Sequence, residues 1–189
     1  MPRSSWSLAA VSLTAVLFAT GCTLSVAAGD PRPNIDLPES QASLALELDP
    51  SVRDVFQVPA RSGVVPTNVE AWRTTLDRGF KNGFRSAFRT DGGKELVLQI
   101  VEAELELAPT AVNEVGGAAA AEAQVRYKAR LVDAQGNVLR RSTGTVASKR
   151  STSQPGEITL IAESAVESMY EKIAEDLFNN RGTASDSVP

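Results

Sequence analysis

Two runs of alternating polar and apolar residues, separated by a glycine pair, constrain the fold more than any other feature of this chain. Residues 96–107 and 121–132 each have the two-residue period of a β-strand with one buried face. Gly116 and Gly117 lie between them, so the sequence predicts an antiparallel hairpin. The register that pairs unlike charges is centred on Gly116. It pairs three glutamates with three basic residues: Glu102 with Arg130, Glu104 with Lys128, and Glu106 with Arg126.

We interpret this strip of paired charges as a cross-strand ladder that keeps one sheet face soluble. A binding strip for a partner is the alternative. The opposite face of the hairpin is apolar and is expected to lie on the core.

Further strands are predicted on both sides of the hairpin. Residues 133–136 (Asp-Ala-Gln-Gly) are typical of a type I turn closed by glycine, and they lead into a strand over residues 138–148. Upstream, residues 44–48 alternate and are ended by Asp-Pro, and residues 55–58 form a shorter candidate strand. The hairpin and the strand after it therefore form a three-strand meander.

Two amphipathic helices complete the predicted fold. The first is expected over residues 67–89, where Thr67-Asn68-Val69-Glu70 has the pattern of a capping box. The second is expected over residues 157–178, with its C-cap at Asn180 or Gly182. The prediction is an α+β fold with a mainly antiparallel sheet, in the order strand, helix, three-strand meander, helix, and with both helices on one face.

Gly79 and Gly83 lie in the interior of the first predicted helix. Each glycine costs about 1 kcal/mol relative to alanine at such a position. We expect close approach of the helix to the sheet to compensate for this cost. An intermolecular helix contact is the alternative.

Composition excludes several classes of function. The 189-residue chain has no histidine and one cysteine, which removes Ser-His-Asp and Cys-His catalysis, imidazole metal sites and any disulfide within the chain. A net charge of −4 lacks the positive excess typical of nucleic-acid binding. Glu163 and Glu167 are expected to be solvated glutamates on a polar helix face. We therefore expect no enzyme, no cofactor and no metal site, with a carboxylate-dependent hydrolase as a distant alternative.

The N-terminus has the organisation of an export signal. Arg3 supplies positive charge, residues 8–18 are apolar, and the small residues 19–21 (Ala-Thr-Gly) precede Cys22. This arrangement resembles the lipobox of bacterial lipoproteins. The resemblance implies cleavage before Cys22 and lipidation of the Cys22 sulfur. Thr23 is similar to the residue found after the cysteine in lipoproteins that are sorted to the outer membrane.

Two other interpretations of this segment remain open. Residues 4–29 carry no charge and are long enough to cross a bilayer as an uncleaved helix. Ordinary secretion with cleavage near Ala28 is the second. With the lipobox, the chain divides into a signal peptide (1–21), a lipidated cysteine with a flexible, proline-rich tether (22–41), a periplasmic α+β domain (42–181) and a disordered tail (182–189).

The order of these elements, with the strand and turn over residues 125–136 and a final helix rich in Glu and Ala, is similar to that of small periplasmic lipoproteins. The likeness is to the LPS-assembly lipoprotein that pairs with an outer-membrane barrel, and to the auxiliary lipoproteins of ABC-type lipid transport systems. It implies a non-catalytic accessory on the periplasmic side of the outer membrane, with a barrel or transporter subunit as partner. A ligand- or glycan-binding scaffold lipoprotein is the alternative.

Four basic residues are the candidate binding surface of the first predicted helix. At about 100° per residue they fall within one sector, opposite the apolar stripe: Arg78, Lys81, Arg85 and Arg89. Guanidinium groups bind phosphate and carboxylate, so this surface could hold an anion or an acidic partner. A solvated helix face is the alternative.

Overall fold

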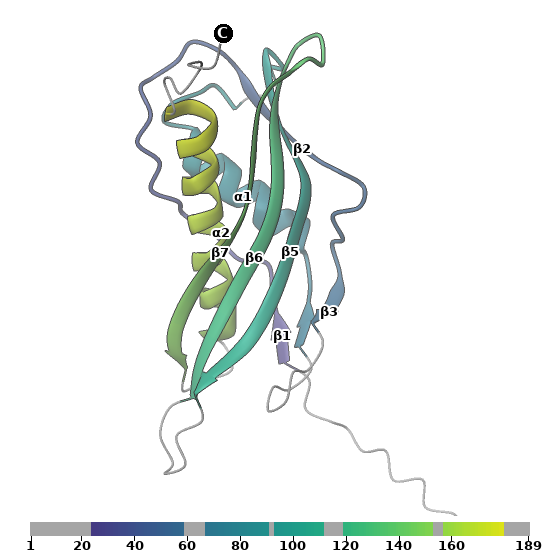
Figure 1. The fold of residues 1–189 in the computed structure, drawn as a ribbon, viewed down its shortest axis with the longest axis vertical. Helices are drawn as coiled ribbons and strands as arrows, with labels where there is room; N and C mark the ends of the chain where they lie inside the picture. The colour runs from purple at the N-terminus through teal and green to yellow at the C-terminus, as the bar shows by residue number, and fades with distance from the viewer. Residues whose placement is uncertain (1–23, 59–66, 91–92, 112–118, 153–156, 180–189) are drawn as a thin grey trace, which may run out of the picture.

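The computed structural model describes residues 24–58, 67–90, 93–111, 119–152 and 157–179, and it contains two sheets and two helices (Figure 1). The larger sheet has the strand order β2-β5-β6-β7, and its strands are β2 (Leu44–Leu48), β5 (Leu96–Ala111), β6 (Ala119–Asp133) and β7 (Val138–Thr152). The smaller sheet has the order β1-β4-β3, and its strands are β1 (Leu24–Val26), β4 (Thr67–Val69) and β3 (Phe56–Val58).

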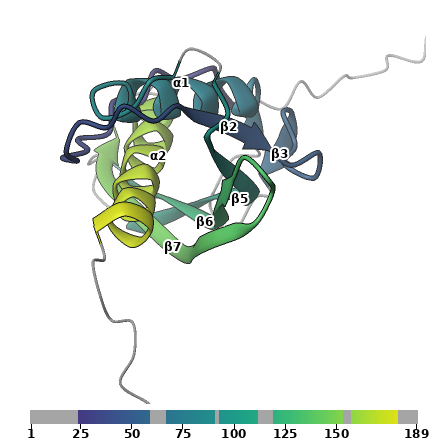
Figure 2. The ribbon, with the colours of Figure 1, turned by 90° about the horizontal axis from the view of Figure 1, so that it is seen from above.

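The helices are α1 (Trp72–Phe84) and α2 (Glu157–Ala174), and a short π-helix, η1 (Glu175–Asn179), extends α2. Seen from above, the larger sheet curves around α2, and α1 crosses near α2 and β2 (Figure 2). The expected α+β class, with a mainly antiparallel sheet and two helices, is confirmed. The cluster between the layers is mostly aliphatic, and its largest buried side chains include Trp72, Tyr127 and Tyr170.

The meander β5-β6-β7 is antiparallel, as predicted, but its register differs. Glu102 pairs with Lys128 and Glu104 with Arg126, two residues away from the expected partners. Both pairs lie on the loop side of a β-bulge between Ile100 and Glu102, and this bulge changes the register by one further residue, so that Ile100 pairs with Ala129. The bulge also changes which residues face the core: Leu98 and Ile100 are buried before it, and the odd-numbered residues are buried after it.

The expected capping box is wrong. Thr67–Val69 forms β4, and the Glu70 amide donates to the Val26 carbonyl at 2.9 Å, so these residues belong to the smaller sheet. Helix α1 instead starts at Trp72, after Ala71 in the left-handed region (φ 54°). Its first amides are satisfied from a distant loop, because the Asp54 carboxylate accepts from the Arg73 amide at 2.8 Å.

The glycine pair in α1 serves a close contact, but the partner is not the sheet. A Cβ at Gly79 would lie 3.0 Å from the Tyr170 ring on α2. A Cβ at Gly83 would lie 2.8 Å from both Pro33 and Ile35. Close approach of α1 to α2 and to the N-terminal segment therefore accounts for both glycines within one molecule.

The flexible tether expected over residues 22–41 is wrong for its described part. Val26 is buried in β1, and Pro31 and Pro33 are buried beyond it. The folded body therefore includes Leu24, eighteen residues before the expected domain boundary at residue 42. Cys22, the signal peptide and the tail over residues 182–189 lie outside the described residues.

Candidate functional site

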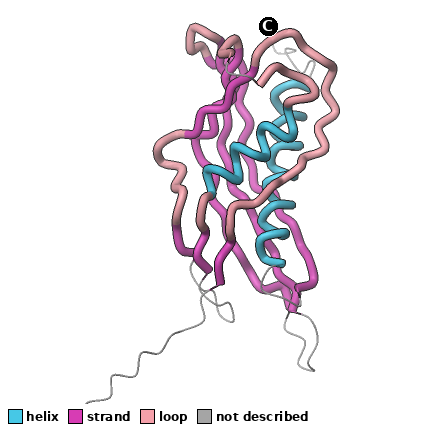
Figure 3. Tube along the Cα trace, turned by 180° about the vertical axis from the view of Figure 1, so that it is seen from behind, coloured by secondary structure: helices cyan, strands magenta, loops and turns pink. Residues whose placement is uncertain are grey.

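Residues 29–35, which we call the strap, run along the helices as an extended loop (Figure 3). Every second backbone amide of the strap donates to a glutamate of α2. The three hydrogen bonds are Asp30 N to Glu163 Oε1 (2.9 Å), Arg32 N to Glu167 Oε1 (2.8 Å) and Asn34 N to Glu171 Oε1 (2.9 Å). The strap is thus held by a regular row of carboxylates.

The regularity follows from two repeat lengths. Four residues of an α-helix rise about 6.0 Å. Two residues of a polyproline-type chain rise about 6.2 Å. Glutamates at every fourth position of α2 therefore stay in step with every second residue of the strap. Pro31 and Pro33 occupy the alternate positions, where their lack of an N–H leaves no donor unsatisfied.

Helix α1 holds the other side of the strap. The Gly29 amide donates to Thr75 Oγ1 at 3.0 Å, and the Asn82 side-chain amide donates to the Asp30 carboxylate and to the Pro31 carbonyl, each at 2.9 Å. Hydrogen bonds from Arg32 and then from Asn82 lower the pKa of Asp30 below its ordinary value. Glu163 and Glu167, expected to be free in solvent, are structural partners of the N-terminal segment.

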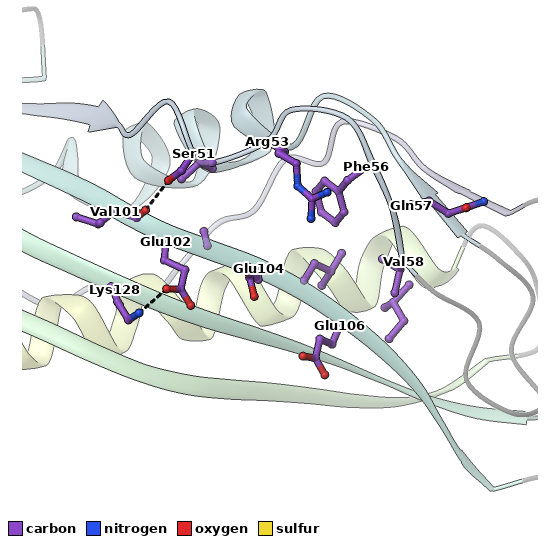
Figure 4. A pocket seen from close by; sticks show the side chains of 14 residues that line it. Ser51, Arg53, Phe56, Gln57, Val58, Val101, Glu102, Glu104, Glu106 and Lys128 are labelled. Carbon is purple, nitrogen blue, oxygen red and sulfur yellow. Dashed lines mark hydrogen bonds and ion pairs between the residues drawn. The ribbon is translucent and has the colours of Figure 1, made fainter.

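A groove of about 520 Å³ lies between the smaller sheet and β5 (Figure 4). One wall comes from the loop after β2 and from β3, and the other comes from β5. The lining residues that the argument below uses are Arg53, Phe56, Val58, Glu104, Leu105 and Leu107. This groove is larger than a second hollow of about 330 Å³ beside Arg85 and Arg89.

Arg73 fixes the loop that forms the first wall. Its guanidinium donates to the carbonyls of Leu48 (3.0 Å), Asp49 (2.9 Å) and Val52 (2.8 Å). Three acceptors on one planar cation hold the chain in a defined turn where β2 ends. The groove is therefore shaped by α1 as well as by the two strands.

The rim of the groove on β5 carries the charge ladder predicted from sequence, in its shifted register. Glu102 is bound by Lys128 at 2.6 Å and by Arg126 at 3.0 Å, and Arg126 also contacts Glu104. The hydrogen bond from Lys128, opposed by partial burial, lowers the pKa of Glu102. The stability that this pair contributes is present above the unfolded pKa of a glutamate and is lost as the pH falls through the lowered folded value.

The structure does not place the four basic candidates on one helix face, because α1 ends at Phe84 and Arg85 is its C-cap. Three of them bind groups of this chain. Arg78 donates to the Gly29 carbonyl (3.3 Å), Lys81 pairs with Asp77 (2.7 Å), and Arg89 pairs with Glu95 (3.4 Å). The expectation of a continuous basic sector on one helix is therefore wrong, and its role in anion binding stays a prediction.

The described ranges offer neither a metal cluster nor a membrane-spanning helix. Those ranges contain no group of three or more acidic or cysteine side chains arranged to hold a metal ion. None of the helices in the same ranges has the length and hydropathy required to span a bilayer.

No protein-family model matches this chain, and neither does any curated protein. Among solved structures, a minor lipoprotein from Acinetobacter baumannii is similar at 14% identity and a TM-score of 0.47, over 76% of this chain and 96% of that chain. A DUF330 protein from Xanthomonas campestris is similar at 13% identity and a TM-score of 0.49, over 81% and 92%. Rare lipoprotein B from Shewanella oneidensis is similar at 13% identity and a TM-score of 0.34, over 70% and 88%.

Proposed function

We propose that this protein is a lipid-anchored, non-catalytic accessory of the bacterial envelope that binds a partner through the groove between β3 and β5. The lipid is attached to Cys22, and the protein lies on the periplasmic side of the outer membrane, in keeping with Thr23 after the cysteine. The observation that carries the proposal is the position of β1. It begins two residues after Cys22 and belongs to the same sheet as β3, one wall of the groove.

The distance from the anchor to the groove follows from chain geometry. Two residues span at most about 7 Å, which limits the separation of Cys22 from Leu24. Leu24 pairs with Thr67, and Thr67 pairs with Val58, so Leu24 and Val58 lie two strand spacings apart. Two spacings are about 10 Å. The groove wall is thus within about 17 Å of the lipidated residue, a reach that suits a membrane-embedded partner.

The anchor and the strap act together. Each buried methylene of an acyl chain contributes about 0.8 kcal/mol to membrane binding, so two or more chains hold a protein stably where one does not. Because β1 and the strap fix the chain that leaves Cys22, the lipid restrains the orientation of the domain as well as its location. The groove therefore faces the region just above the bilayer.

Replacing the cysteine tests the anchor. In Cys22→Ser we expect a protein without acyl chains that keeps residues 1–21, because no sulfur is left for acylation and the leader of a lipoprotein is removed only after its cysteine is acylated. The matched control is Thr23→Ser, which keeps the cysteine and should be acylated and cleaved before Cys22. Intact-mass spectrometry measures both. A wild-type protein that keeps residues 1–21 and carries no acyl chain would indicate an uncleaved helix and would contradict the proposal.

A further inference from the structure

We propose that the groove takes an extended segment of a partner polypeptide, which adds as a strand to the edge of β5 over residues 103–107. This inference rests on the proposed function and specifies its partner. It depends on which backbone groups face the groove, on the edge of the opposite wall, and on the charge of the lining.

One edge of β5 loses its partner strand at the bulge. Strand β2 pairs with β5 from Leu96 to Ile100 and then turns away at Asp49, whose amide donates to the Ile100 carbonyl at 3.0 Å. Beyond this point the described strands provide β5 with a ladder partner only on the β6 side. The second half of β5 is therefore a strand edge.

Side chains show which way the peptide groups of this edge point. Trp72 Nε1 donates to the Ala103 carbonyl at 3.0 Å, from the side of β5 away from β6. Along a strand, every second residue directs both its N–H and its C=O to the same side. Leu105 and Leu107 therefore direct their peptide groups toward the groove, as Ala103 does. Trp72 already binds the Ala103 carbonyl, so the groups that an extended backbone can bind are the Ala103 N–H and the peptide groups of Leu105 and Leu107.

The opposite wall is also a strand edge. Strand β3 pairs with β4 along one side, Phe56 with Val69 and Val58 with Thr67, and it is the terminal strand of the smaller sheet. The groove thus separates the edges of two sheets (Figure 4). Residues 103–107 span about 14 Å at the rise of a β-strand, which matches a segment of four or five residues.

The lining specifies the side chains of that segment. Phe56, Val58, Leu105 and Leu107 give the groove an apolar base. Its charged lining residues are Glu102, Glu104, Glu106, Arg53 and Lys128, and Arg126 on β6 binds Glu102 and Glu104 from beside the groove. Because side chains alternate along a strand, the bound segment should alternate apolar and basic residues.

Amide hydrogen exchange tests the proposal with the full lipidated protein in detergent. In the free protein, the amides of Ala103, Leu105 and Leu107 should exchange quickly, while those of Glu102, Glu104 and Glu106 are protected by pairing with β6. An octapeptide of alternating valine and lysine should slow exchange at the three odd-numbered amides at least tenfold. It should also shift the emission of Trp72, the tryptophan that remains once the leader is removed.

Two controls separate backbone recognition from charge. The same peptide with proline at every second position lacks the donors for a ladder and should give no protection. The double variant Glu104→Lys, Glu106→Lys should bind the valine–lysine peptide at least tenfold more weakly and should bind a valine–glutamate peptide in its place. Both glutamates lie on the solvent side of β5, so this variant retains the core.

Several results would overturn the proposal. The first is that the amides of Ala103, Leu105 and Leu107 are already protected from exchange in dilute protein without peptide. The second is that millimolar valine–lysine peptide protects none of these amides. The third is that the peptide protects amides outside residues 103–107. Protection by phosphatidylglycerol vesicles alone would identify a lipid site, and protection that rises with protein concentration alone would identify a second copy. Cys22→Ser should give the same exchange pattern, so loss of lipidation and loss of peptide binding are distinguished.

Discussion

Replacing Trp72 by alanine is expected to remove a large part of the protein's free energy of unfolding. The indole is fully buried at the start of α1, packs edge-to-face on Phe56 with ring centroids 6.2 Å apart, and donates to the Ala103 carbonyl. Removing a buried tryptophan costs about 3–5 kcal/mol, because a cavity is left in a packed core. A domain of this size has about 5–15 kcal/mol of stability in all. Urea unfolding followed by circular dichroism measures the loss.

Trp72→Phe is the matched control for the cavity. It keeps an aromatic ring against Phe56 and removes the N–H that binds Ala103, so we expect a smaller loss, of about 1–2 kcal/mol. A difference of less than 1 kcal/mol between the alanine variant and the wild type would mean that this side chain does not join α1 to β5. The groove wall would then need another support.

Removing the carboxylates that hold the strap is expected to release it from α2. In the triple variant Glu163→Ala, Glu167→Ala, Glu171→Ala, the amides of Asp30, Arg32 and Asn34 lose their acceptors. At about 1 kcal/mol for each hydrogen bond, the free energy of unfolding should fall by about 3 kcal/mol. Hydrogen exchange at these three amides should become faster.

The corresponding triple glutamine variant is the control, because a side-chain amide keeps an oxygen at the accepting position. It should retain slow exchange at the three strap amides and lose less stability than the alanine variant. Equal exchange rates in the alanine variant and the wild type would show that the carboxylates do not hold the strap. The segment would then be fixed by Pro31, Pro33 and α1 alone.

The meander and α2 could be predicted from sequence because their patterns are local. Strand alternation over residues 96–107 and 121–132, the turn at Asp133 to Gly136 and the apolar face of α2 each lie within one continuous segment. The structure confirms the turn, with Gly136 at φ 84° and its amide 3.0 Å from the Asp133 carbonyl. The pairing register was missed because Glu102 and Glu104 face basic residues in two registers, the predicted one and the one two residues away that the structure shows.

The remaining differences come from contacts between distant segments. The cap of α1 is supplied by Asp54, and no residue near Ala71 indicates this. The parallel pairing of β2 with β5, and the pairing of β1 with β4, join residues more than 40 positions apart. Prolines in the strap indicated an extended chain correctly, but an extended chain can be bound or free, and only the row of glutamates on α2 decides between the two.

The groove could not be predicted from the sequence either, because its walls include β3 and the end of β5, which the prediction did not place together. The signal that was present is the stop at Asp49-Pro50, which ends β2 while β5 continues. A long strand beside a short one leaves an edge, and a long strand edge calls for a cover or a partner. The basic residues of α1 were more conspicuous in the sequence, yet Arg78, Lys81 and Arg89 bind groups within the chain.

The orientation of the domain on the membrane tests the account most directly. Cys22 is the single cysteine, so a lipidated protein offers no free thiol, and one new cysteine can be labelled selectively. Fluorophores are placed at Gln57→Cys, beside the groove, or at Ala134→Cys, in the turn between β6 and β7 at the other end of the molecule (Figure 1). With headgroup-quencher vesicles, we predict several-fold stronger quenching at position 57 than at position 134. Equal quenching, or stronger quenching at position 134, would contradict a domain held groove-first against the bilayer.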